Sequence, residues 1–396
     1  MKAVVFHGVG DIRMETVADP SISEANDAVV RITTAAICGT DLHMIRGTMP
    51  GMQPGTVLGH EGVGVVEDVG KGVRNLKPGD RVVVPSTIAC GYCSYCRSGY
   101  FAQCDHANPN GPAAGTAFFG GPKTTGPFQG LQAEYARVPY ANVGLVKLPS
   151  EVTDDQAILL SDIFPTAHFG ADLAEIRKGN TVAVFGCGPV GQFAIISAFL
   201  KGAGRVIAID NVPSRLDMAR RHGAECVNFD DENPVEAIRE LTGGIGVDRT
   251  IDAVGIDAEA PSKHAHTGTR TKGERESAKG NDRGRNWVPG NKPTQALEWA
   301  TEAVAKAGTV AIIGVYPETE GSYPIGKAMN KNLTVKMGNC NHRAYIPELV
   351  GYVREGLIDP TQVLTQDEPL ESAIEAYKNF DLRKSGWTKV ALNVAA

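Results

Sequence analysis

The stretch Thr181–Gly191 reads TVAVFGCGPVG, in which a short β-branched and apolar run leads directly into three glycines spaced G-x-G-x-x-G. The run predicts a buried strand, and the apolar residues that continue to Leu200 predict a helix. Glycines between a strand and a helix allow a tight turn and bring the backbone close to a pyrophosphate, which then rests on the free N–H groups of the helix start. In this context the motif is a strong signal for a dinucleotide-binding unit, and its candidate cofactor-binding residues are Gly186, Gly188, Pro189, Val190 and Gly191.

A second predicted strand, Arg205–Asp210, ends in an acid 22 residues after the second glycine of the motif. Asp210 is expected to accept hydrogen bonds from the adenosine ribose hydroxyls, and its charge would repel a 2′-phosphate. The pattern therefore predicts NAD rather than NADP, with a plain strand-end cap as the alternative for Asp210. Arg215 is a further candidate for contact with the ribose.

The segments that follow continue to alternate, with predicted helices over 214–222 and 234–241 and predicted strands over 247–254 and 309–315. Such alternation predicts a parallel, doubly wound sheet. Residues 257–294 interrupt it with a polar, charge-rich insertion that is long for a compact domain. Two interpretations stay open for this insertion, a flap beside the bound cofactor and a surface loop.

The first half of the chain is rich in short β-branched runs, and a Pro-Gly turn at 77–80 precedes a returning strand. These features predict a mostly antiparallel, barrel-like domain. The predicted strands are Val4–Phe6, Ala28–Ile32, Gly62–Glu67 and Arg81–Val84. A Gly- and Pro-rich loop over 108–130 is interpreted either as a wall of a substrate pocket or as a surface loop.

The segment Cys38–His43 reads CGTDLH, and Gly59-His60-Glu61 follows it. A thiolate and an imidazole are typical zinc ligands. Thr40 adds a hydroxyl two residues after the thiolate, and His43 adds a titratable group three residues further on. Together these residues can hold a metal, place an alcohol oxygen on it and carry a proton away.

Four cysteines gather in one short stretch, at Cys90, Cys93, Cys96 and Cys104. Their spacing predicts a closed, structural Cys₄ zinc site that leaves no position for a substrate. Disulfides and free thiols are the alternatives, and both are disfavoured in the reducing cytoplasm.

Bulk properties restrict the remaining classes of function. A chain of 396 residues predicts two domains, and a net charge of -6 gives no reason to expect nucleic-acid or membrane binding. No apolar run reaches the roughly 18 residues of a membrane span, and the N-terminus lacks the apolar region of a signal peptide. We therefore expect a cytoplasmic protein that acts on a small molecule.

The motifs together resemble the zinc-containing medium-chain alcohol dehydrogenase family over nearly the full length of the chain. The resemblance implies a GroES-like β-barrel catalytic domain over 1–163 and 340–396, with a Rossmann NAD-binding domain over 164–339 inserted between its parts. It also implies NAD and two zinc ions per chain, one catalytic and one structural. Relatives are dimers or tetramers, so a homo-oligomer is expected, with a tetramer favoured.

The third protein ligand of the catalytic zinc is a cysteine in many relatives, but this chain has Asp162 at that place. From composition alone Asp162 is a helix-boundary carboxylate, because Pro165 follows it closely. The surrounding residues 161–166, SDIFPT, are similar to the formaldehyde dehydrogenase-like branch, in which aspartate is the ligand. The resemblance therefore implies a catalytic zinc on Cys38, His60 and Asp162.

The resemblance assigns several other roles. It implies that Glu61 binds the metal transiently and that Lys389 serves the cofactor pyrophosphate, which many relatives contact through a basic residue at the position of Gly39. Asp41 is a candidate acceptor for the ring N–H of His60.

The activity expected from these residues is hydride transfer between an alcohol or aldehyde hydrate and NAD. Thr40 takes the alcohol proton and passes it through the cofactor ribose to His43. Three alternatives remain: formaldehyde dismutation with tightly held NAD, a zinc-free quinone reductase, and a non-catalytic NAD-binding relative.

Overall fold

The computed structural model describes residues 1–111, 114–261, 285–318 and 320–394. The chain divides into two compact units. The first unit comprises Met1–Pro165, Asn339–Asp381 and Lys389–Ala396, and the second comprises Thr166–Gly338 and Leu382–Thr388. The sequence does not predict that Leu382–Thr388 joins the second unit. Residues 262–284, the middle of the insertion interpreted as a flap, lie outside the described residues.

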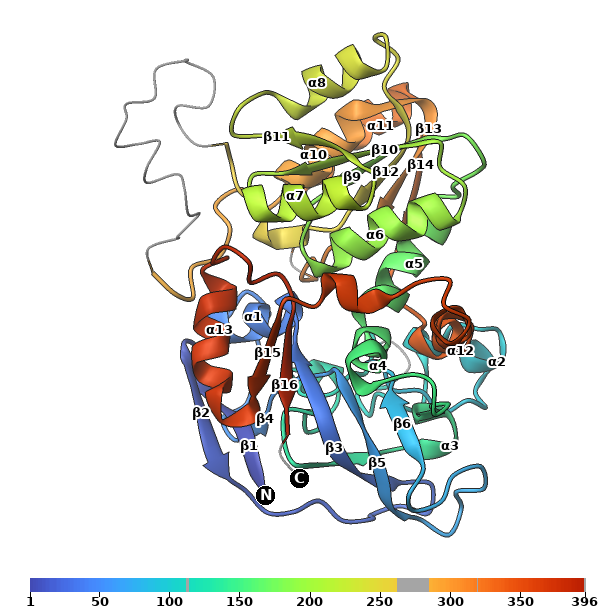
Figure 1. Cartoon of the computed structure of the whole chain (residues 1–396), viewed down its shortest axis with the longest axis vertical. Coiled ribbons are helices and arrows are strands. Elements are labelled where there is room, and N and C mark those ends of the chain that lie inside the picture. Colours follow the sequence, from blue (N-terminus) through green and yellow to red (C-terminus); the bar gives the residue numbers. More distant parts are fainter. Residues whose placement is uncertain (112–113, 262–284, 319, 395–396) are drawn as a thin grey trace. The chain divides into compact units, whose positions relative to one another are not determined.

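The second unit is built on a parallel sheet whose described strands follow the order β11-β10-β9-β12-β13-β14 (Figure 1). The order runs outward in both directions from β9, which makes the sheet doubly wound, as the sequence predicts. The strands are β9 (Thr181–Phe185), β10 (Arg205–Asp210), β11 (Glu225–Asn228), β12 (Val247–Asp252), β13 (Val304–Ile312) and β14 (Thr334–Met337).

Helices cover this sheet on both faces (Figure 1). On one face α6 packs against α7, and on the other α10 contacts α8 and α11. The core between sheet and helices includes Phe185, Ile207, Ile238, Trp299 and Val310. The helices are α6 (Pro189–Leu200), α7 (Pro213–Arg221), α8 (Pro234–Leu241), α10 (Gln295–Ala303) and α11 (Ile325–Asn330).

The first unit contains a largely antiparallel sheet of order β15-β16-β3-β5-β6-β8, with β7 paired to β3, and a smaller sheet of order β2-β1-β4. Its central strand β3 carries two irregularities in its register with β5, which coil the sheet toward a barrel. A Cβ on Gly64 would lie 2.2 Å from the carbonyl oxygen of Arg31, so the close approach of these strands requires glycine. The strands are β1 (Lys2–Gly8), β2 (Asp11–Thr16), β3 (Ala28–Ile37), β4 (Thr56–Val57), β5 (Gly62–Val69), β6 (Arg81–Val84), β7 (Tyr135–Val138), β8 (Val146–Lys147), β15 (Gln366–Pro369) and β16 (Val390–Asn393).

Helical segments at the ends of these strands carry the residues of the candidate site. Asp162, with backbone φ -142° and ψ -66°, separates the helices α4 and α5, which the sequence predicts as one helical stretch over 151–175. Among the described residues no helix is long and apolar enough to cross a membrane. The helices of the first unit are α1 (Gly39–Arg46), α2 (Ser94–Arg97), α3 (Ala141–Gly144), α4 (Asp154–Ser161), α12 (His342–Arg354) and α13 (Ala373–Asp381). Helix α5 (Ile163–Leu173) begins in the first unit and belongs to the second from Thr166 onward.

Candidate metal and dinucleotide sites

Three chain segments of the first unit bring the predicted ligands of the catalytic zinc together. Cys38 follows β3 and caps the start of α1, where its backbone N–H donates to Asp41 Oδ2 at 3.0 Å. His60 precedes β5 and follows Gly59, whose φ of 89° and contact with Gln132 exclude a side chain. Asp162 occupies the break between α4 and α5.

The donor atoms of these residues have the spacing that a tetrahedral zinc ion requires. Asp162 Oδ2 lies 3.5 Å from Cys38 Sγ and 3.4 Å from His60 Nε2. Zinc bonds of about 2.3 Å to sulfur and about 2.0–2.1 Å to nitrogen and oxygen place tetrahedral ligands about 3.4–3.5 Å apart. A carboxylate oxygen of Glu61 belongs to the same group, in which all donor atoms lie within 4.8 Å of one another and all four residues are buried. The residues present therefore fit a zinc ion.

Further polar groups hold the ligands from behind. His60 Nδ1 lies 3.0 Å from Asp41 Oδ1, the carboxylate that the sequence offers as a candidate acceptor for the ring N–H. In the other ligand, Asp162, the oxygen Oδ1 accepts a hydrogen bond from Ser86 Oγ at 3.1 Å. The same oxygen lies 2.7 Å from His342 Nε2. Sequence reasoning did not identify Ser86 or His342. His342 stands 180 residues after Asp162, so no local pattern singled it out.

The ionisation of the cluster is shaped by burial and by its own charges. Burial lowers the pKa of His60, but Asp41 and Cys38 outweigh it and hold that pKa well above its ordinary value. Burial raises the pKa of Asp162, but hydrogen bonds from His342 and His60 outweigh it and hold that pKa well below its usual range. The pocket thus stabilises positive charge beside an ionised carboxylate, and a divalent cation would displace the proton of His60.

Glu61 and Lys389 form a buried ion pair beside this cluster. One carboxylate oxygen of Glu61 meets Lys389 Nζ, which also donates to the carbonyl oxygen of Ile37 at 3.0 Å. The other, Oε1, is buried without a hydrogen-bond partner among the described residues. Burial raises the pKa of Glu61 to about 7, although Lys389 acts in the opposite direction. The ammonium of Lys389, which the family resemblance assigns to the cofactor pyrophosphate, is thus paired with Glu61 in this structure.

Thr40 and His43 lie on α1, three residues apart and hence on neighbouring positions of one face. His43 is buried, and its Nδ1 lies 3.1 Å from Thr48 Oγ1. The loop over 108–130 reaches the metal cluster, because the ring of Phe118 meets the ring of His60 edge to face with centroids 6.1 Å apart. An aromatic side chain thus lies against a predicted metal ligand.

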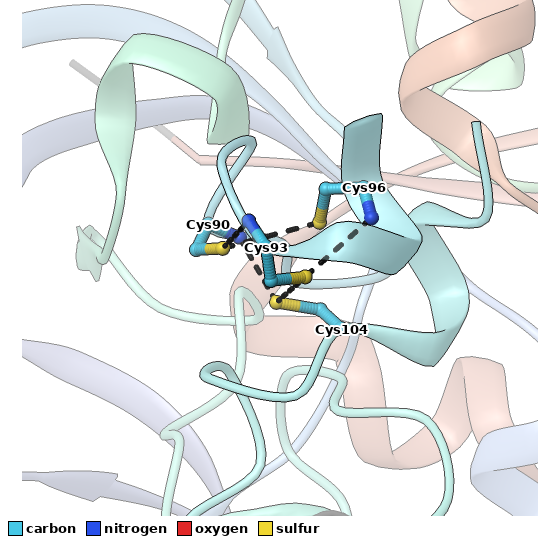
Figure 2. Close-up of side chains that lie close together, drawn as sticks. All are labelled: Cys90, Cys93, Cys96 and Cys104. Carbon is cyan, nitrogen blue, oxygen red and sulfur yellow. Dashed lines mark hydrogen bonds between the residues drawn. The ribbon is translucent and has the colours of Figure 1, made fainter. Parts of the chain in front are cut away.

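The four clustered cysteines converge as predicted (Figure 2). Cys90 Sγ lies 4.0 Å from Cys96 Sγ, and Cys93 Sγ lies 3.9 Å from Cys104 Sγ. These separations are far longer than the roughly 2.05 Å of a disulfide and close to the roughly 3.8 Å between thiolates on one zinc ion. Burial raises the pKa of Cys90 to about 11 and acts on Cys93 in the same direction, but backbone N–H groups of Cys96 and Asp105 outweigh it there and lower the pKa of Cys93 to about 7. The spacing of the sulfurs and not their ionisation thus identifies the site. The sulfurs are therefore arranged as metal ligands.

In the second unit the glycine motif forms a tight turn between β9 and α6. Gly186 has φ 88°, and a Cβ on Gly191 would lie 1.9 Å from the carbonyl oxygen of Gly186. Gly188 caps α6, and Pro189 opens it where no backbone donor is needed, with Val190 next in the first turn. A glycine turn that opens a helix in this way is the arrangement that binds a dinucleotide pyrophosphate.

Asp210 is buried at the end of β10 and holds this turn. Its Oδ2 accepts the backbone N–H of Cys187 at 2.7 Å, and its Oδ1 accepts those of Asn211 and Val212 at 2.8 and 2.9 Å. The guanidinium of Arg215 is also near, 3.9 Å from the position of a Cβ on Gly188. The predicted ribose-binding residues and the glycine motif therefore meet at one edge of the parallel sheet.

Comparison with known protein families agrees with both units. Residues 24–150 match the alcohol dehydrogenase GroES-like domain, and residues 189–273 match the zinc-binding dehydrogenase domain. The chain belongs to the zinc-type alcohol dehydrogenases of the medium-chain dehydrogenase/reductase family, a zinc-binding and NAD(P)-binding family of oxidoreductases.

Individual relatives cover the whole chain. It is 40% identical over 403 aligned positions to the uncharacterized zinc-type alcohol dehydrogenase-like protein AdhB of Bacillus subtilis, covering 99% of this chain and 100% of that protein. It is 34% identical to a glutathione-independent formaldehyde dehydrogenase of Pseudomonas aeruginosa, covering 96% and 94%. The solved structure of alcohol dehydrogenase TADH from Thermus sp. ATN1 is similar with a TM-score of 0.82 and 35% identity, covering 100% of both chains.

Proposed function

We propose that this protein is an NAD- and zinc-dependent dehydrogenase that transfers a hydride between NAD and a small alcohol or aldehyde hydrate, of formaldehyde-like or short-chain size. The observation that carries the proposal is the buried Cys38, His60 and Asp162 donor set with tetrahedral spacing. The similarity to a glutathione-independent formaldehyde dehydrogenase supports the substrate class and the formaldehyde dehydrogenase-like branch.

When bound, zinc supplies Lewis acidity toward the substrate oxygen, and NAD accepts the hydride. Cys38, His60 and Asp162 hold the metal, and Glu61 is a candidate for transient binding because its Oε1 is buried and unpartnered among the described residues. The hydroxyl of Thr40 takes the proton of the substrate alcohol. His43, on the same helix and held by Thr48, is the group that carries that proton onward.

The cofactor is proposed to bind at Gly186, Gly188, Pro189, Val190 and Gly191, with its ribose on Asp210 and Arg215. Asp210 supports NAD over NADP, because a buried carboxylate at this place disfavours a 2′-phosphate. The second zinc of the proposed pair binds Cys90, Cys93, Cys96 and Cys104. We further propose that the protein is cytoplasmic and forms a homo-oligomer, a tetramer or a dimer. Light scattering of the purified protein tests the oligomeric state.

A substrate panel tests the activity. Formaldehyde, short primary alcohols and longer alcohols are offered with NAD or NADP, with and without glutathione, and reduced cofactor is followed by absorbance. NAD reduction with formaldehyde or short alcohols, independent of glutathione, is expected. Aldehyde conversion without added NAD would replace this proposal by dismutation, and activity that survives complete zinc removal would overturn it.

The ligand assignment is tested by counting metal. The Asp162→Ala variant is expected to retain about one zinc per chain, on the cysteines, against about two in the parent. Two full equivalents in the variant would contradict the assignment of Asp162.

A further inference from the structure

The first turn of α12 places His342 directly against the proposed metal ligand Asp162. His342 is the first residue of that helix and is buried, and its Nε2 lies 2.7 Å from Asp162 Oδ1. Both residues belong to the first unit, although 180 positions separate them in the chain. The mechanism proposed above does not use His342.

The two oxygens of Asp162 face different partners. Oδ1 meets His342 Nε2 and the hydroxyl of Ser86, at 2.7 and 3.1 Å. Oδ2 is the oxygen that lies 3.5 Å from Cys38 Sγ, at the spacing of ligands on one metal ion. The two contacts on Oδ1 thus fix the rotation of the carboxylate and leave Oδ2 for the metal.

The hydrogen positions follow from the chemistry of the partners. An ionised carboxylate only accepts, so His342 Nε2 must carry the hydrogen that bridges to Asp162. The hydroxyl of Thr87 lies 3.1 Å from His342 Nδ1, and the hydroxyl of Ser86 lies 3.4 Å from the same nitrogen. Because a hydroxyl can donate or accept, these contacts hold the ring with Nε2 toward Asp162 whether or not Nδ1 carries a hydrogen.

We propose that His342, with Ser86, is a positioning residue that holds Asp162 as a one-oxygen ligand and so sets the affinity and geometry of the catalytic metal. This inference rests on the proposed function, because it takes Asp162 as a zinc ligand. His342 itself lies outside the ligand group, which comprises Cys38, His60, Glu61 and Asp162 among the described residues. It acts on the metal through Asp162, as outer partners of metal ligands commonly do.

The test compares substitutions at neighbouring residues of one helix start. His342→Leu removes the donor but keeps bulk, whereas His342→Gln retains an amide N–H near the position of Nε2. Asn341→Ala is the matched control, because the Asn341 side chain accepts the backbone N–H of Ala102 and does not face the ligand. The readouts are the rate and equilibrium of zinc loss to a chelator and the visible spectrum of the cobalt-substituted protein.

We expect His342→Leu to weaken binding of one zinc per chain by about 10–100-fold, the usual effect of removing an outer partner of a ligand. The cobalt spectrum of His342→Leu should shift, His342→Gln should restore much of the affinity, and Asn341→Ala should keep the parental spectrum. A merely structural role for His342 would lower the thermal stability of His342→Leu but leave the cobalt spectrum and the affinity of the catalytic metal unchanged, which would overturn the proposal.

Failure of this inference is distinguishable from failure of the proposed function. If Asp162→Ala loses one zinc but His342→Leu binds zinc as the parent does, only the positioning role is overturned. If Asp162→Ala keeps both zincs, the ligand assignment itself fails. In the double variant Asp162→Ala, His342→Leu, the proposal expects no further loss of affinity beyond that of Asp162→Ala, because His342 would no longer have a ligand to hold.

Discussion

The ammonium group of Lys389 and the carboxylate of Glu61 form an ion pair in which neither side chain has exposed surface. Lys389 directly precedes the strand β16, and Glu61 adjoins the proposed ligand His60. A buried pair contributes little net stability, but removing one partner leaves an uncompensated charge in a medium of low polarity. The pair therefore ties the last strand of the chain to the metal cluster.

Replacing Lys389 by Met tests this pair. At pH 8 the zinc-loaded variant should be less stable, by at most about 3–5 kcal/mol, because the buried Glu61 must either keep its charge without a counter-charge or take up a proton. Thermal unfolding measures the effect, with Lys2→Ala as a control, since the Lys2–Glu371 pair is exposed and should leave the apparent Tm unchanged. The double variant Lys389→Met, Glu61→Gln should recover most of the loss, and a single variant as stable as the parent would refute the role of the pair.

The pKa of Glu61 predicts a pH dependence in the zinc-free protein. Burial raises that pKa from 4.5 to about 7, so between these values the folded chain holds a proton that the unfolded chain has released. Stability from this group is therefore fully present below about pH 4.5 and is lost as the pH rises to about 7. The apparent Tm of EDTA-treated parent and Glu61→Gln should be compared across this range. The parent should lose more stability with rising pH than the variant, and parallel profiles would contradict the assignment.

The cysteine cluster predicts a selective loss of the structural metal. Cys93→Ser should leave about one zinc per chain, because three thiolates and a hydroxyl hold zinc poorly. The loop that carries the cysteines has little core of its own, so the variant should also unfold at a lower temperature. Cys226→Ser, at a partly exposed cysteine far outside the cluster in the sequence, is the control and should retain two zincs. Equal zinc content in the two variants would argue against a Cys₄ site.

Local pattern was sufficient for the parallel sheet of the second unit and for the cysteine cluster, whereas Asp162 was identified as a ligand only through the family resemblance. The glycine motif between an apolar run and a helix predicts β9 and α6 because its signal lies within about 20 consecutive residues. The spacing of the clustered cysteines likewise needs no tertiary information.

Contacts between distant segments could not be predicted in this way. The apolar pattern of the sequence predicts a helix only over 346–356, whereas α12 starts four residues earlier, at His342, and contains Pro347 without ending there. This shorter prediction left His342 in a loop, away from Asp162. Lys389 was assigned to a pyrophosphate by resemblance, but its partner Glu61 lies 328 positions away and no periodicity indicates that pair.

Asp210 holds the glycine turn as well as offering a carboxylate to the ribose, and this double role predicts the outcome of its substitution. Asp210→Ala removes the acceptor for the backbone N–H of Cys187, so the turn that receives the pyrophosphate should lose its fixed geometry. Affinity for NADH and for NADPH should therefore both fall, by about 10-fold or more for NADH because hydrogen bonds to a charged group contribute about 1.5–3 kcal/mol each. Fluorescence titration with NADH and with NADPH measures both affinities. Asp217→Ala is the control, because Asp217 is exposed on α7 and pairs with Arg220. A variant that gained affinity for NADPH and kept its affinity for NADH would contradict this prediction. Asp210 would then act only on the 2′ position of the adenosine ribose, and its hydrogen bond to the backbone of Cys187 would not contribute to cofactor binding.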